Sequence, residues 1–152
     1  MFAGLCLIAH AEPPSPELAP ESPLESSAEA LLQLAGDFSP RYEMVRPHLV
    51  VVDISGLGRL FGTPGEIGEA FCRTARERDL TVAIGIASTQ TTALLLALHQ
   101  ATVGSVDDER LTVVRLGREA AALAPLPLAL LTALPSDRLT NDDVAFLSLI
   151  HI

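Results

Sequence analysis

Residues 38–62 read FSPRYEMVRPHLVVVDISGLGRLFG, and this stretch decides the fold. Two runs within it, residues 38–45 and 49–55, have the apolar and β-branched composition of strands. Between them lie Arg46, Pro47 and His48. Pro47 has no backbone N–H to donate, so it cannot lie inside a central strand and favours a turn instead. The stretch therefore predicts a β-hairpin.

The flanking sequence predicts helices and strands on both sides of this hairpin. A continuous apolar run predicts a buried strand near the start, and capping residues, proline at a first helical turn and apolar stripes predict the helices. The order β, α, β, β, α, β, α, β, α is typical of a split βαβ, ferredoxin-like fold. We therefore expect an α/β (α+β) domain with a mixed or antiparallel sheet and helices on one face. The predicted strands are residues 2–9, 38–45, 49–55, 81–87 and 112–115, and the predicted helices are 27–36, 63–78, 88–101, 117–123 and 128–134.

Composition places the chain among compact globular domains. It has 152 residues, of which 49% are hydrophobic and 19% charged, and aromatic residues make up only 4%. Cys6 and Cys72 do not show the spacing of a metal site, which favours a reduced, cytoplasmic setting. The first eleven residues imitate a signal peptide but lack its basic segment. Pro125 and Pro127 interrupt the apolar run at 123–134, so we expect no membrane span.

The charge balance limits the partners of the chain. Its 19 acidic and 10 basic residues give a formal net charge of −9, and every basic residue is arginine. Neutralisation of phosphates supplies most non-specific affinity for DNA, and here few arginines would act against an adverse field. We expect the chain to bind DNA only weakly or within a larger complex.

Three segments together resemble one protein family. Residues 38–43 and 50–62 resemble the palm hairpin of Y-family DNA polymerases, and their sequence is most similar to that of the ImuB (UmuC-domain) group. Residues 80–90, LTVAIGIASTQ, resemble the strand-to-helix turn that reads Gly-Ile-Ala-x-Asn-Lys in active members. Residues 116–127, LGREAAALAPLP, resemble the exit from the palm toward the thumb. The resemblance covers about residues 37–134.

The resemblance implies a domain organisation. Residues 1–11 would be the first palm strand and residues 28–124 the palm-like core. Residues 12–27, rich in proline and acidic residues, would be an exposed linker in place of the family's fingers. Residues 125–152 would begin a thumb-like region that breaks off, as in a truncated gene or a chain with a non-native tail.

The departures from the family pattern concern its metal ligands. The resemblance implies three carboxylates that hold two Mg²⁺ ions. One carboxylate would come from the first strand, and the other two from an Asp-Glu pair that, in the family, lies five and four positions before the Asp of a Leu-Asp-Leu run, which is Asp53 here. Residues 1–11 contain no Asp or Glu, and the positions of the pair hold His48 and Leu49. Leucine has no donor atom, and neutral imidazole suits softer metals. We therefore predict no catalytic residues, no metal site and no cofactor.

Three residues are candidates for contact with nucleic acid. Arg41 lies in the hairpin segment, and Thr89 and Gln90 lie in the strand-to-helix turn. Gln90 stands where the resemblance implies a lysine directed at phosphate, so one positive charge is missing.

These observations leave three hypotheses for function. The resemblance implies a non-catalytic accessory protein of DNA repair and SOS-type translesion synthesis, acting through contacts with an error-prone DNA polymerase and the sliding clamp. The second hypothesis is an active, Mg²⁺-dependent nucleotidyltransferase whose ligands are Glu12, Glu43 and Asp53. The third is a stand-alone ferredoxin-like domain that binds a ligand or dimerises. Fold alone does not separate them.

Overall fold

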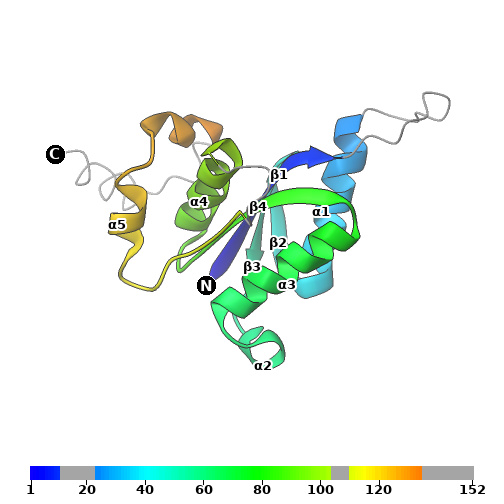
Figure 1. Ribbon diagram of the computed structural model, residues 1–152, viewed down its shortest axis with the longest axis horizontal. Coiled ribbons are helices and arrows are strands. Elements are labelled where there is room, and N and C mark those ends of the chain that lie inside the picture. Colours follow the sequence, from blue (N-terminus) through cyan, green and yellow to red (C-terminus); the bar gives the residue numbers. More distant parts are fainter. Residues whose placement is uncertain (11–22, 104–109, 135–152) are drawn as a thin grey trace.

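A computed structural model describes residues 1–10, 23–103 and 110–134 of the chain. Within these residues, a five-stranded sheet has the strand order β2-β3-β1-β4-β5 (Figure 1). The strands are β1 (Phe2–His10), β2 (Tyr42–Arg46), β3 (Leu49–Asp53), β4 (Leu80–Ala87) and β5 (Leu111–Val113). The helices are α1 (Pro23–Phe38), α2 (Gly58–Phe61), α3 (Pro64–Glu77), α4 (Gln90–Val103), α5 (Glu119–Leu123) and the 3₁₀ helix η1 (Leu128–Ala133).

The sheet is mixed, as predicted. Strands β2 and β3 form the predicted antiparallel hairpin, and β1 lies antiparallel between β3 and β4. Strand β5 pairs with β4 in parallel, which requires the crossover through α4. The first four strands with α1 and α3 form the split βαβ, ferredoxin-like unit, so the predicted fold class is confirmed.

The face of the sheet that carries α1 and α3 is packed with large side chains. Leu5, Val50 and Ile84 point to this face, and each is 0% exposed. Phe71 of α3 is also fully buried, and its ring stacks on that of Phe38 with 3.9 Å between centroids. These residues alternate with those of the opposite face because successive strand side chains point to opposite sides.

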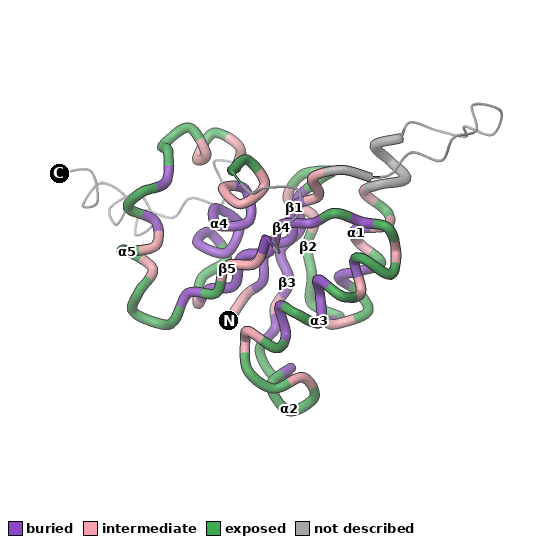
Figure 2. Tube along the Cα trace, in the orientation of Figure 1, coloured by how far each residue is buried: buried purple, intermediate pink, exposed green. Residues whose placement is uncertain are grey.

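The opposite face is covered by α4, which lies across β1 and β4 (Figures 1 and 2). Gly4 and Gly85 are register partners in these two strands. A Cβ atom at either position would lie 2.5 Å from the carbonyl oxygen of Ala93 in α4. The helix backbone can therefore rest directly on the strands only because both residues are glycine.

The prediction that helices cover one face is correct for α1 and α3 but wrong for α4. The crossover from β4 to the parallel β5 passes over the opposite face, where α4 packs on β1 and β4. Residues 91–98 of α4 are all buried, and residues 93–98 among them are apolar on every side of the helix.

Several element boundaries differ from the predictions. Helix α1 begins at Pro23 rather than Ser27, so the predicted linker 12–27 does not extend to its expected end. Proline is favoured in a first helical turn because its missing N–H needs no partner there. Helix α1 ends at Phe38 instead of Gly36, β5 stops at Val113, and α2 was not predicted. Residues 11–22 and 135–152, which include the rest of the linker and the expected break, lie outside the described residues.

The start of α3 is as the sequence predicts. The Thr63 side chain accepts a hydrogen bond from the Glu66 backbone N–H, and the Glu66 carboxylate accepts one from the Thr63 N–H, forming a capping box. Among the described residues, no helix is both long and apolar enough to cross a membrane.

Candidate functional site

The turn of the hairpin places His48 and Leu49 in different surroundings. His48 is exposed, and its carbonyl oxygen accepts a hydrogen bond of 2.8 Å from the Leu7 N–H in β1. Leu49 is 0% exposed and belongs to the apolar cluster on the α4 face. The two residues are therefore adjacent in the sequence, but their side chains do not lie on one surface at which both could act.

The surroundings of Leu49 exclude water. Its register partner is Cys6, which is 3% exposed and lies in the same cluster. Burial raises the pKa of the Cys6 thiol to about 11, because the apolar environment disfavours the thiolate. An ionised carboxylate at this position would meet the same penalty unless a cation were bound beside it.

The donor set at this end of the sheet does not fit Mg²⁺. A hard cation of this size needs several oxygen ligands in octahedral geometry, and the Leu49 side chain supplies none. The imidazole of His48 is a ligand for softer metals. Within the part of the chain that the structure describes, no three His, Cys, Asp or Glu side chains are grouped as a metal site.

A second feature is an open hollow of about 340 Å³. It lies on the α4 face of the sheet, over strands β2 and β3. Its volume lies at the lower end of the range of about 300–1,000 Å³ that is usual for small-molecule sites. We call this feature the β2–β3 hollow. It is lined by Phe2, Arg41, Tyr42, Glu43, Val51, Asp53 and Gln90.

The charges in the β2–β3 hollow do not favour phosphate strongly. The Arg41 guanidinium lies 3.8 Å from the Asp53 carboxylate, and Arg41 is 80% exposed. Asp53 also accepts a 2.9 Å hydrogen bond from the Ser55 N–H. Hydrogen bonds from the side chain and backbone of Ser55 lower the pKa of Asp53, and Arg41 lowers it further. With Glu43 also present, one arginine faces two carboxylates.

The predicted nucleic-acid contacts divide between two places. Arg41 and Gln90, far apart in the sequence, line the same hollow. Thr89 is not among the lining residues, and it caps α4 instead. Its hydroxyl oxygen accepts a 3.2 Å hydrogen bond from the Thr92 N–H, and its carbonyl accepts one from the Ala93 N–H. Contact with nucleic acid stays a prediction for all three residues.

The neighbouring Ser88 fixes the same turn from another direction. Its hydroxyl donates a hydrogen bond to the Glu119 carboxylate of α5. This hydrogen bond is the main reason why the pKa of Glu119 lies below its ordinary value. The start of α4 is thus held by both its own cap and a contact from α5.

The alternative set of acidic ligands is partly brought together. Glu43 and Asp53 line the β2–β3 hollow, whereas Glu12 lies outside the described residues. Sequence reasoning missed the apolar lining by Phe2 and Val51; Tyr42 also borders the hollow, but its ring lies against Gly36 of α1. The even spacing of Val51 and Asp53 along β3 was a signal that these two side chains share a face.

Comparisons with known proteins agree with this geometry. The model of the impB/mucB/samB family matches residues 21–97. Among solved structures, the chain resembles one titled "Dbh Ternary Complex (substrates partially disordered)", with 16% identity and a TM-score of 0.54 over 76% of this chain and 34% of the other. It also resembles an "Insertion ternary complex of Dbh DNA polymerase", with 16% identity and a TM-score of 0.51 over 75% of this chain and 32% of the other.

The matched solved structures are much longer than this chain and share little sequence identity with it. The chain spans about a third of the length of the solved structures it resembles. At this level of identity the likeness establishes the fold. No curated protein matches the chain.

Proposed function

Because this chain belongs to the impB/mucB/samB family, and so has a Y-family polymerase-like domain, we propose that it serves DNA repair and translesion synthesis without catalysing nucleotide transfer. Its contribution would consist of contacts with other proteins of the damage response. The partners we propose are an error-prone DNA polymerase and the sliding clamp, in the cytoplasm of a cell under SOS-type induction.

The burial of Leu49 is the observation that carries this proposal. The position implied for a metal-binding glutamate holds a side chain that is 0% exposed and packed in an apolar cluster. A substitution that merely lost a carboxylate would leave a polar gap, whereas here the space belongs to the core. The fold is thereby stabilised at the place where the family's chemistry would occur.

The β2–β3 hollow supports a minor role for DNA. Arg41 and Gln90 could meet a nucleic-acid strand there, but the two carboxylates oppose phosphate and the chain has a net charge of −9. We therefore propose that DNA binding occurs mainly within a complex whose other members supply the positive charge.

Primer extension tests the absence of catalysis. The full chain is incubated with a primed template, Mg²⁺ and all four nucleoside triphosphates, with an active Y-family polymerase as positive control. We expect no extension above a reaction without protein. Extension that depends on both protein and Mg²⁺ would refute the proposal. A pull-down with purified clamp and polymerase then tests the partners, and retention of neither would remove the accessory role.

The position of Glu43 and Asp53 in one hollow favours a second candidate, the active nucleotidyltransferase. A Mg²⁺ titration followed by heteronuclear NMR separates the two functions. We expect no saturable shifts at Glu43, Asp53, His48 or Leu49. Saturable shifts at Glu43 and Asp53 that disappear in Glu43→Gln would establish a metal site and favour the enzyme.

A further inference from the structure

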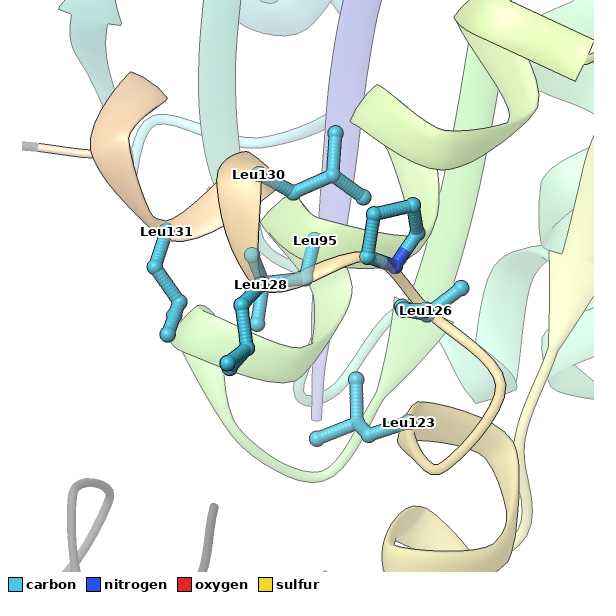
Figure 3. A pocket seen from close by; sticks show the side chains of 7 residues that line it. Leu95, Leu123, Leu126, Leu128, Leu130 and Leu131 are labelled. Carbon is cyan, nitrogen blue, oxygen red and sulfur yellow. The ribbon is translucent and has the colours of Figure 1, made fainter. Parts of the chain in front are cut away.

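The segment that follows α5 crosses the outer side of α4, and we call residues 125–134 the strap. Its first and last leucines, Leu126 and Leu134, are 8% and 4% exposed, whereas Leu128 between them is 51% exposed. Figure 3 shows Leu128, Leu130 and Leu131 on η1, with Leu95 of α4 behind them. The strap is therefore anchored at its two ends, and between them Leu128 is exposed while Leu130 and Leu131 are only partly buried.

The internal hydrogen bonds of the strap are those of a weak element. The Leu130 N–H donates to the Pro127 carbonyl at 3.1 Å, and the Leu134 N–H donates to the Leu131 carbonyl at 3.2 Å. Such three-residue spacing has poorer geometry than an α-helix and is seldom stable in longer runs. Segments with few buried contacts and exposed backbone hydrogen bonds open locally at low free energy.

One side chain joins the strap to the sheet. The Arg46 Nε–H donates a 3.2 Å hydrogen bond to the carbonyl oxygen of Ala133. Arg46 is exposed and ends β2, next to the turn that carries His48. The hairpin turn and the C-terminal end of the strap are thus linked across the fold, although they lie far apart in the sequence.

We propose that the strap is a releasable cover, with Arg46 as its latch. When the latch opens, residues 125–134 leave α4 as a unit, and the leucine-lined surface around Leu95 and Leu123 is uncovered. The sheet remains folded, because the apolar cluster beneath α1 and α3 contains no strap residue, and the cluster on the α4 face loses only Leu126 and Leu134 from its buried members. An anionic group that engages Arg46 at the hairpin turn would compete with the Ala133 carbonyl and raise the fraction of chains in which the strap is open.

Hydrogen–deuterium exchange of the full chain tests this device. Arg46→Ala removes the latch, Arg46→Lys keeps a donor at the same place, and Arg59→Ala is the control, since Arg59 is an exposed arginine of α2. We expect amides of residues 126–134 to exchange about fivefold faster in Arg46→Ala, as expected for one lost hydrogen bond, and less so in Arg46→Lys. Arg59→Ala should leave this segment unchanged.

Two outcomes would overturn the proposal. If exchange in residues 126–134 is the same in Arg46→Ala and in the parent chain, Arg46 is not a latch. If the amides of β1 and β4 accelerate by the same factor as the strap, opening is global and no separate cover exists. A third readout is binding of a hydrophobic dye, which should increase in Arg46→Ala and stay at the parent level in Arg59→Ala.

Discussion

The two faces of the sheet are stabilised by opposite means. Under α1 and α3, large side chains such as Leu5 and Ile84 meet the stacked rings of Phe38 and Phe71. Under α4, the paired glycines of β1 and β4 remove side-chain volume so that helix backbone approaches strand backbone. The face under α1 and α3, which we call the volume-filled face, thus depends on large side chains, whereas the face under α4 depends on the absence of side chains at the paired glycines.

The two faces also differ in their relation to the candidate functional site. The features of the candidate site lie on or beside the α4 face: Leu49 is buried in its cluster, and the β2–β3 hollow opens beside the start of α4 at Gln90. The close contact at Gly4 and Gly85 sets the position of α4 and hence of Gln90. Changes to the α1 and α3 face should therefore affect stability alone, whereas changes to the α4 face should also affect the hollow.

The largest expected effect comes from emptying the volume-filled face. Phe71→Ala removes a fully buried ring that stacks on Phe38. We expect the free energy of unfolding to fall by about 4 kcal/mol, the cost of lost burial plus the cavity that remains. Urea denaturation followed by circular dichroism measures it. Phe71→Leu, which retains most of the volume, should cost much less, and equal losses in both variants would contradict the volume argument.

The next effect comes from filling the glycine contact. In Gly85→Ala the added Cβ would lie 2.5 Å from the Ala93 carbonyl oxygen and 2.8 Å from the Ala97 nitrogen, both backbone atoms. We expect a loss of about 3 kcal/mol, because backbone yields less easily than a side chain. NMR shifts at Gln90 should report that α4 has moved. The same substitution at Gly58, which has no heavy atom within 4 Å, is the control and should not destabilise the fold.

The sequence predicted what depends on local signals. Pro47 marked the hairpin turn, Thr63 and Pro64 marked the start of α3, and the β-branched residues of 81–87 marked a strand, because these signals act over a few residues. It did not predict the face that α4 covers. That face is set by the crossover from β4 to the parallel β5, and the register of Gly4 with Gly85, two positions far apart in the chain, then allows α4 to approach closely.

The candidate site was predicted residue by residue but not as a surface. The resemblance singled out Arg41 and Gln90 separately, and only the sheet register brings them to one hollow. Leucine at position 49 indicated the loss of a ligand, but its complete burial depends on the cluster formed with α4. The sequence predicted a helix from position 88, and the hydrogen bond from the Thr92 N–H to the Thr89 hydroxyl identifies Thr89 as its cap.

A smaller effect tests how α3 is attached to the volume-filled face. Thr63→Ala removes the hydroxyl that accepts the Glu66 N–H, and with it one half of the capping box. We expect a loss of about 1 kcal/mol, the usual value for an N-cap residue. Thr63→Ser keeps the acceptor and should retain most of the stability. Equal denaturation midpoints for Thr63→Ala and the parent chain would show that α3 is held by the packing of its buried side chains, such as Ile67 and Phe71, and not by its cap.

The smallest expected effect lies in the hollow and depends on pH. Hydrogen bonds from Ser55, with a contribution from Arg41, hold the pKa of Asp53 below its ordinary value of 3.8 in the folded chain. The ionised form therefore favours folding: its contribution is complete above the unfolded pKa and disappears as pH falls through the folded one.

Asp53→Asn should accordingly be less stable than the parent chain near neutral pH, by an amount on the order of 0.5 kcal/mol because the pair with Arg41 is largely exposed. Paired urea titrations at pH 7 and at successively lower values below 4 measure the difference between the two chains. The difference should shrink toward zero as Asp53 is protonated, since the neutral acid loses the charge that the Ser55 hydrogen bonds and, to a smaller extent, Arg41 favour. A constant difference over the whole range would mean that shape, and not charge, is what Asp53 contributes to the open side of the α4 face.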